Sequence, residues 1–399
     1  MGRINSLWEK CLLSFFAIYF FVIIFIKQST IGDTYTSLTT IATIMVNISL
    51  LVFSIQVLFI NRYTLKQWIV LIITFLIISF SSFVANDQVL LSSFIVAFAF
   101  KNFSYKKLVS ISFYSTLIAF IIVVVLSSMS IINPNLIYRG AGVIRTAFGF
   151  LHPNIAGAIY LSLIVRLLEI KKSNMSFLWL LLIGLFSTYF FTKTDSKTTI
   201  VMLVVTALFF FAHTMFKDKK GYDSIIFFIG TITTPMMFLS SLLLAVNYPT
   251  SQFSIKINDL LTGRIYYIKQ FLDKYGISLI GQEINLLSWA DSKTVIGSVP
   301  MILDNSYMQL LIKFGFIPSL LYLIIITAII WKLYKTDNIF QIIVIIVFQL
   351  FGFSQSQMLQ VSINYSILLV SLILNNKKVE NLNEKNFFKS NISRSISNN

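Results

Sequence analysis

The chain has 399 residues, of which 57% are apolar and only 12% are charged. A water-soluble domain could not cover so much apolar surface, so this composition indicates an integral membrane protein. The net charge of +16 does not indicate nucleic-acid binding, because the Lys and Arg residues lie mainly in short segments between apolar runs. That distribution is typical of membrane orientation.

Twelve apolar runs are candidates for membrane spans, each of which needs roughly 20 residues. They are 11–26, 38–60, 67–85, 88–100, 108–132, 153–170, 176–192, 198–216, 224–246, 307–331, 339–355 and 358–374. The first run has no small-residue cleavage site behind it, so it is interpreted as a retained span. The fourth is short, and a tilted, an extended or a re-entrant course all fit it. The sequence therefore predicts an all-α integral membrane protein with about 12 transmembrane helices in a polytopic domain over 1–374.

Placing the N-terminus in the cytoplasm gives the inside segments nearly twice as many Lys and Arg residues as the outside segments. This agrees with the positive-inside rule and puts both termini in the cytoplasm. The tail, 375–399, is rich in Asn, Ser and Lys and is predicted to be disordered.

The longest outer segment, 247–306, is predicted to be an extracytoplasmic loop that contains a helix. Apolar residues at 261, 265, 268, 272 and 275 are spaced as on one face of a helix over 260–277. We expect this amphipathic helix to lie in the outer interface, with Tyr266 and Tyr267 at the level of the lipid headgroups.

The stretch GVIRTAFGFLHPNIAGAIY, residues 142–160, places polar residues at the outer end of the sixth run. Pro153 is predicted to begin the helix, because proline tolerates the first helical position. The positive end of the helix dipole and its free N–H groups would then lie beside Arg145 and His152, which favours phosphate binding. In the alternative interpretation, Arg145 holds a lipid headgroup while His152 and Asn154 cap the helix.

Three further basic residues of the outer segments are candidates for an anion site. Arg139 shares a loop with Arg145 and is interpreted in the same two ways. Lys197 lies in the turn TKTDSKTT, residues 192–199, which is either a solvated turn or part of an anion site. Arg264, in LTGRIYYIKQF, is either a second arm of a phosphate clamp or an interfacial Arg that snorkels from a surface helix.

The stretch ILDNSYMQLLIKFGF, residues 302–316, leads into the tenth run. Asp304, Asn305 and Ser306 are typical helix-capping residues, so capping is the default interpretation. Asp304 is also a carboxylate at the outer mouth of the bundle, where it is placed to accept a proton from a sugar hydroxyl as a general base. Tyr307 is interpreted as stacking on a sugar ring or as an anchor at the interface.

No Walker A, GxGxxG, HExxH or Cys/His cluster motif occurs, so the sequence gives no support for ATP hydrolysis or zinc chemistry. The expected site therefore has neither a metal nor a cofactor.

Four elements occur together in order: IRTAFGFLHPN after the fifth run, TGR in the long outer loop, LIGQE from Leu279, and DNSYMQLLIKFGF at the tenth run. This ordered set resembles the O-antigen ligase/polymerase superfamily and, within it, the Wzy-type polysaccharide polymerases of capsule and exopolysaccharide pathways. The resemblance covers residues 130–325, and the first four runs match only as generic apolar helices.

The resemblance implies a metal-independent, membrane-embedded glycosyltransferase of the GT-C type. Such enzymes use glycans linked to undecaprenyl pyrophosphate at the outer face of the bacterial cytoplasmic membrane. Membrane lipids, and a flippase and a chain-length regulator of the same pathway, are the implied partners; nucleic acid is not.

By position, the resemblance implies that Arg145 and Arg264 hold the pyrophosphate, and Arg139 is placed with them. Asp304 fits the polymerase branch, because the ligase branch usually has a His at that position. Lys197 stands where an Arg is common; a Lys keeps the charge but loses the bidentate fork.

The predicted reaction joins the growing lipid-linked chain to the non-reducing sugar of a second lipid-linked repeat unit, with inversion at the anomeric carbon. Asp304, or His152 as second choice, would accept the proton of the acceptor hydroxyl. Asn154, Asn305, Tyr307 and Lys197 are expected to bind sugar or to support the site. Two alternatives remain: a ligase that transfers the glycan to another acceptor, and a polysaccharide flippase or exporter.

Overall fold

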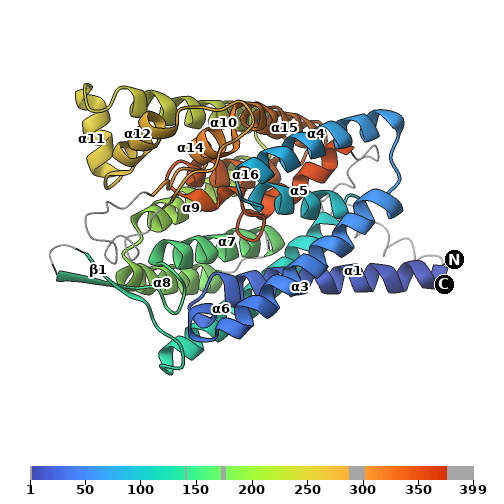
Figure 1. Ribbon diagram of the computed structural model, residues 1–399, viewed down its shortest axis with the longest axis horizontal. Helices are drawn as coiled ribbons and strands as arrows, with labels where there is room; N and C mark the ends of the chain where they lie inside the picture. The colour runs from blue at the N-terminus through green and yellow to red at the C-terminus, as the bar shows by residue number, and fades with distance from the viewer. Residues whose placement is uncertain (1, 140–141, 172–176, 287–301, 375–399) are drawn as a thin grey trace.

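The computed structural model describes residues 2–139, 142–171, 177–286 and 302–374, which form a bundle of helices that run mostly along one long axis (Figure 1). Eight helical segments of the described residues are long and apolar enough to cross a membrane. They are Leu7–Lys27, Thr36–Ile60, Leu65–Val84, Tyr105–Ser128, Pro153–Lys171, Lys197–Phe216, Tyr222–Val246 and Phe316–Lys335. The prediction of an all-α, multi-pass membrane protein is therefore confirmed.

The helices carry the following bounds. In the first half they are α1 (Gly2–Val22), which continues as a π-helical turn to Lys27, α2 (Ile31–Thr34), α3 (Thr36–Ile55), which continues to Ile60, α4 (Leu65–Val84), α5 (Val89–Ala99) and α6 (Tyr105–Ser128). In the second half they are α7 (Pro153–Lys171), α8 (Phe177–Thr194), α9 (Lys197–Phe216), α10 (Tyr222–Val246), α11 (Gln252–Leu260), α12 (Arg264–Tyr275), α14 (Ser306–Met308), η5 (Gln309–Phe314), α15 (Phe316–Lys335), α16 (Ile339–Gly352), η6 (Ser356–Leu359) and η7 (Tyr365–Leu374).

Three of the twelve predicted spans form shorter apolar helices. α5 has 11 residues, α16 has 14 and η7 has 10. At 1.5 Å per residue, 14 residues reach only about 21 Å, less than the ~30 Å of a bilayer core. The count of twelve complete crossings is therefore not confirmed.

The tenth predicted span, 307–331, is broken at Gly315. The chain first forms α14 and the π-helical turn η5, and α15 begins only at Phe316. Gly315 has a φ of +99°, and a Cβ atom there would lie 2.5 Å from the backbone nitrogen of Gly281. The segment around Gly281 fills the break, since the Gln282 N–H donates to the carbonyl of Lys313 over 2.9 Å. The membrane-length helix α15 thus begins nine residues after the predicted start, because the first residues of the predicted span pack against this segment instead.

A second break, residues 353–364, separates α16 from η7 inside the bundle. Polar groups from other helices satisfy its backbone. The hydroxyl of Ser93 donates to the carbonyl of Leu359 over 2.9 Å, and the Arg166 guanidinium donates to that of Ser362 over 2.8 Å. Such partners are needed because backbone polar groups in an apolar interior have no water to bind.

The sequence reading did not predict a β-hairpin, but one follows α6. β1 (Leu136–Arg139) and β2 (Val143–Thr146) pair antiparallel, with Ile137 opposite Arg145. The hairpin lies at the same end of the bundle as α11 and α12, whereas α1 begins at the other end (Figure 1). This arrangement agrees with the separation of inner and outer segments made from charge, although which end faces outward stays a prediction.

The amphipathic helix expected over 260–277 corresponds to α12 (Arg264–Tyr275), whose polar face is exposed. Its apolar face is buried in protein: Ile265 and Phe271 are 0% exposed and Ile268 is 1% exposed. These side chains join an apolar cluster with Tyr307 and Leu310 of α14 and η5. The apolar face was read as membrane-facing because periodicity alone does not distinguish a lipid from a protein neighbour. The predicted disordered tail, 375–399, lies outside the described residues, as does 287–301 of the long loop.

Candidate functional site

Arg145 projects from β2 and is only 8% exposed. Its Nε donates to the carbonyl of Thr194 over 2.8 Å, and an Nη atom donates to Oδ1 of Asn154 over 3.0 Å. The hairpin is thereby attached to the C-terminal end of α8 and the first turn of α7. Since a guanidinium has five N–H donors in a planar fork, Arg145 can bind both neighbours at once.

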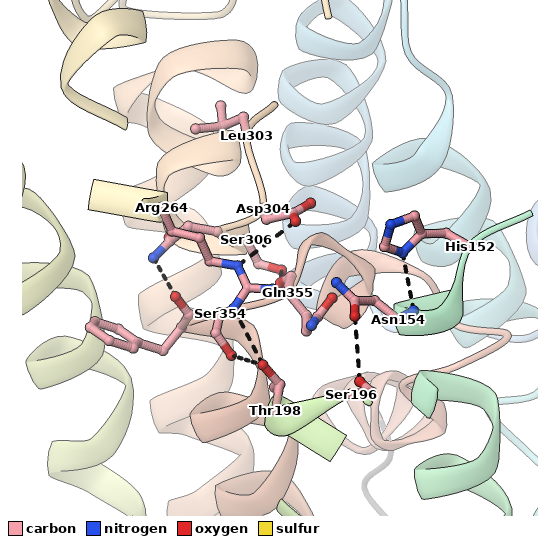
Figure 2. Close-up of polar contacts among 12 residues, drawn as sticks. His152, Asn154, Ser196, Thr198, Arg264, Leu303, Asp304, Ser306, Ser354 and Gln355 are labelled. Carbon is pink, nitrogen blue, oxygen red and sulfur yellow. Dashed lines mark hydrogen bonds and ion pairs between the residues drawn. The ribbon is translucent and has the colours of Figure 1, made fainter. Parts of the chain in front are cut away.

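The N-terminus of α9 lies beside this Arg. Ser196, the residue before the helix, donates its hydroxyl hydrogen bond to Oδ1 of Asn154 over 3.4 Å, and it makes no side-chain bond to the free N–H groups of the helix (Figure 2). Gly157 allows this approach of α7 and α9, since a Cβ atom there would lie 2.1 Å from Oγ1 of Thr199. The positive dipole ends of two helices, α7 and α9, therefore meet here.

Arg264 reaches the same helix end from the opposite side. It begins α12 directly after Gly263, whose φ of +89° turns the chain into the helix. Its Nη1 donates to the hydroxyl of Thr198 over 3.3 Å, and its Nε lies 3.8 Å from Oδ2 of Asp304. Figure 2 shows Arg264 and Asn154 on the two sides of this turn of α9.

Asp304 is not the residue that caps the following helix. Asn305 takes that role: its Oδ1 accepts from the Met308 N–H over 2.9 Å, and its Nδ2 donates to Ser241 and to the carbonyl of Phe353. The Asp304 side chain is consequently available for its ion pair and stays 31% exposed. Burial raises the pKa of the Asp304 carboxyl above its ordinary value, and the nearby Arg264 guanidinium opposes this rise.

His152 is held in its neutral form. Burial, followed by the charges of Arg145 and Arg264, lowers its pKa to about 4. Its Nδ1 accepts the backbone N–H of Asn154 over 3.1 Å, so His152 caps α7, whereas the side chain of Asn154, the other predicted cap, accepts from Arg145 and Ser196. With the Nδ1 lone pair used in this way, the remaining proton lies on Nε2, so His152 is better placed to donate a hydrogen bond than to accept a proton.

The other predicted residues fall outside this cluster. Tyr307 is 0% exposed and donates its hydroxyl proton to Gln349, so it supports the core and neither stacks on a sugar nor anchors at an interface. Lys197 is exposed, and its neighbours Ser196 and Thr198 make the contacts instead. Arg139 is the last residue of β1, and its side chain lies outside the described part of the structure.

Four residues of the cluster were missed in the sequence: Ser196, Thr198, Ser354 and Gln355. Ser354 donates its hydroxyl hydrogen bond to Thr198 over 3.3 Å, and the Gln355 carbonyl accepts from Ser306 over 2.5 Å. Ser354 and Gln355 belong to the break between α16 and η7. The sequence did contain an indication of this break, because the polar residues SQSQ at 354–357 separate two otherwise apolar runs.

Searches against family models, curated proteins and solved structures found no match to the chain. Within the described residues, no group of three or more His, Cys, Asp or Glu side chains is placed to hold a metal ion.

The arrangement favours an anion next to a carboxylate. Two guanidinium groups and two helix N-termini supply positive potential, and Asp304 supplies one negative charge at 3.8 Å from Arg264. A phosphate would match the positive potential, and a group that loses a proton would match the Asp304 carboxylate.

Proposed function

We propose that the protein is a membrane-embedded glycosyltransferase that joins oligosaccharide repeat units linked to undecaprenyl pyrophosphate. The reaction takes place at the outer face of the bacterial cytoplasmic membrane, with both termini of the chain in the cytoplasm. Twelve crossings, counting the short and broken helices, and a GT-C-type bundle belong to this proposal, as do contacts with membrane lipids and with a flippase and a chain-length regulator.

One observation carries the proposal: Arg145 and Arg264, 119 positions apart, lie on either side of the first turn of α9. Arg145 reaches that turn through Asn154 and Ser196, and Arg264 reaches it through Thr198. A pyrophosphate would lie between the guanidinium groups and the free N–H groups of the helix. Donors aimed at the leaving pyrophosphate stabilise the charge that develops as the glycosidic bond breaks.

Asp304 is the general base in this proposal. Its carboxylate stays partly exposed beside the pyrophosphate site, and burial raises its pKa toward that of an effective proton acceptor. The proton of the acceptor hydroxyl would pass to Asp304 as the oxygen attacks the anomeric carbon from the side opposite to the pyrophosphate. This single displacement inverts the anomeric centre.

A ligase would use the same residues with a different acceptor, so it remains the nearer alternative. An exporter would need charged groups along a path through the bundle. The buried Arg166 and Glu169 instead contact protein groups, Arg166 with the Ser362 carbonyl and Glu169 with Gln341. This observation favours a transferase over an exporter.

The test uses purified protein in lipid vesicles with lipid-linked repeat units as substrate. We expect a ladder of longer glycans from the wild type and none from Arg145→Ala or Arg264→Ala, because removal of such a donor costs about 10²–10³-fold in rate. Lys269→Ala is the matched control: it also lies on α12, but it pairs with Asp273 over 2.7 Å and is expected to keep the ladder.

A ladder from both Arg variants would reject the pyrophosphate site. Glycan joined only to an added non-lipid acceptor would favour the ligase, and movement of substrate across the membrane without elongation would favour the exporter.

A further inference from the structure

Gln355 lies in the candidate site although no motif marks it. It stands two residues after Phe353 in the break between α16 and η7, and its backbone carbonyl accepts the Ser306 hydroxyl over 2.5 Å. Its neighbour Ser354 contacts Thr198 over 3.3 Å, the same hydroxyl that Arg264 contacts. Figure 2 shows the Gln355 side chain between Ser306 and Asn154, with Asp304 and Arg264 on one side and Ser196 on the other.

The backbone of Gln355 is thus held in place, but its amide is not. Both Nε2 and Oε1 are buried without a hydrogen-bond partner among the described residues, and the residue is 1% exposed. Burial of an amide without partners costs free energy, and such groups in native proteins call for an explanation. The rest of the cluster is paired, as Asn305, Ser306 and Thr198 illustrate.

We propose that the Gln355 amide binds a sugar of the lipid-linked glycan, through a hydroxyl or an acetamido group, and so contributes to glycan selection. This inference rests on the proposed function. An amide donates from Nε2 and accepts at Oε1, and hydroxyl and acetamido groups likewise offer both a donor and an acceptor. A pyrophosphate offers acceptors only, so it would leave Oε1 unpaired.

The position of Gln355 agrees with this division of roles. The guanidinium groups and the α9 N-terminus supply the positive charge that a pyrophosphate needs, whereas Gln355 is neutral. A glycan that reaches the amide has to displace the side chains around it, since only 1% of the residue is exposed. Its hydrogen bonds then form out of competition with water, and a sugar that lacks the matching group is rejected.

The experiment compares two probes on purified protein in nanodiscs: undecaprenyl pyrophosphate without sugar, and lipid-linked oligosaccharide extracted from cells that make the protein. For the wild type, we expect the oligosaccharide probe to bind more tightly. For Gln355→Leu, we expect its dissociation constant to rise about tenfold or more, while that of the bare pyrophosphate lipid stays within a factor of two. Arg264→Ala is expected to weaken both.

Gln357→Leu is the matched control. Gln357 lies in the same break, is 7% exposed and also has a buried Oε1 without a partner in the described part of the chain. Among the described residues it makes no hydrogen bond or ion pair with Arg145, Arg264, Asp304 or Gln355, so its substitution is expected to leave both dissociation constants unchanged. Thermal unfolding midpoints of both Leu variants are expected at or above that of the wild type, because an unpaired amide is replaced by an apolar side chain.

If Gln355→Leu weakens the binding of both probes equally, or weakens the binding of neither, the inference is overturned while the pyrophosphate site stays intact. The inference is likewise overturned if the wild type binds the two probes with equal affinity. Failure of the wild type to bind either lipid overturns the proposed function and this inference with it.

Discussion

Two arginine-centred regions of the molecule look alike in composition and differ in what surrounds them. At the candidate site, Arg264 lies 3.8 Å from a carboxylate that is 31% exposed, and a helix begins beside it. In the bundle interior, Arg166 is 0% exposed, donates to the Ser362 carbonyl and has the rings of Phe20 and Tyr365 within 5.5 Å of its guanidinium carbon. Glu169 is one helical turn away on α7 and bonds to Gln341 over 3.0 Å.

The comparison shows that an Arg near a carboxylate is not by itself a reactive site. Arg166 holds the break between α16 and η7, because the Ser362 carbonyl needs a donor in an apolar interior. Arg264 instead contacts the side chains of Thr198 over 3.3 Å and Asp304 over 3.8 Å, and the Asp304 side chain is 31% exposed. The first is expected to matter for stability and the second for activity.

The largest effect that this comparison predicts is a fall in the rate of glycan elongation by the Asp304→Asn variant. The amide keeps the size of the side chain but cannot accept the proton, so polymer formation should fall about 10²–10⁴-fold. Rates of glycan elongation measure this, with Asp273→Asn, an exposed residue of α12, as the control. Elongation within threefold of the wild type by Asp304→Asn would remove this residue from the mechanism.

The next effect separates the two arginines by stability. Arg166→Met leaves the Ser362 carbonyl without its donor and Glu169 without its neighbouring positive charge, so we expect a loss of about 1–3 kcal/mol in unfolding free energy. Arg264→Ala should lose less than about 1 kcal/mol, as is typical for a partly exposed pair. Thermal unfolding in detergent measures both; the reverse order would contradict the roles assigned here.

The smallest effect concerns pH. With the pKa of His152 lowered to about 4, this residue is neutral from pH 5 upward and should give no inflection near pH 6.5 in the activity profile. In the unfolded chain it takes a proton near pH 6.5, so its contribution to stability is lost as pH falls from about 6.5 to about 4. His152→Gln should flatten that slope in unfolding experiments. An activity step at pH 6–7 that this variant removes would instead make His152 a titrating group of the reaction.

Most helices were predictable from the sequence because apolar runs longer than 18 residues have few other structures available in a membrane protein. Pro153 gave the start of α7, and the capping types before the tenth run gave Asn305 as a cap. Arg145 and Arg264 were singled out as basic residues in outer segments and Asp304 as a carboxylate at the outer mouth, and the resemblance favoured all three. The spacing of these residues did not predict that their side chains lie close together, since this depends on how α7, α9 and α12 pack.

The misses have physical causes of their own. Residues 307–314 are apolar in the sequence whether they cross a membrane or pack against residues 278–282, so hydropathy placed the tenth span too early. The β-hairpin is four residues per strand, too short to stand out beside helices of 20 residues or more. Thr198 and Gln355 are common polar residues, and only the fold brings them together.

The pairing of β1 with β2 has a consequence for how this chain tolerates change over time. Leu136, Tyr138 and Ile144 are all at least 49% exposed, so their identities are weakly constrained. Side chains alternate between the two faces of a strand, so the gain or loss of one residue within β2 would turn Arg145 to the face now occupied by Ile144. These three exposed positions should therefore accept substitutions freely, whereas the hairpin should exclude single-residue insertions and deletions before Arg145, so spacing is the trait to look for in distant relatives.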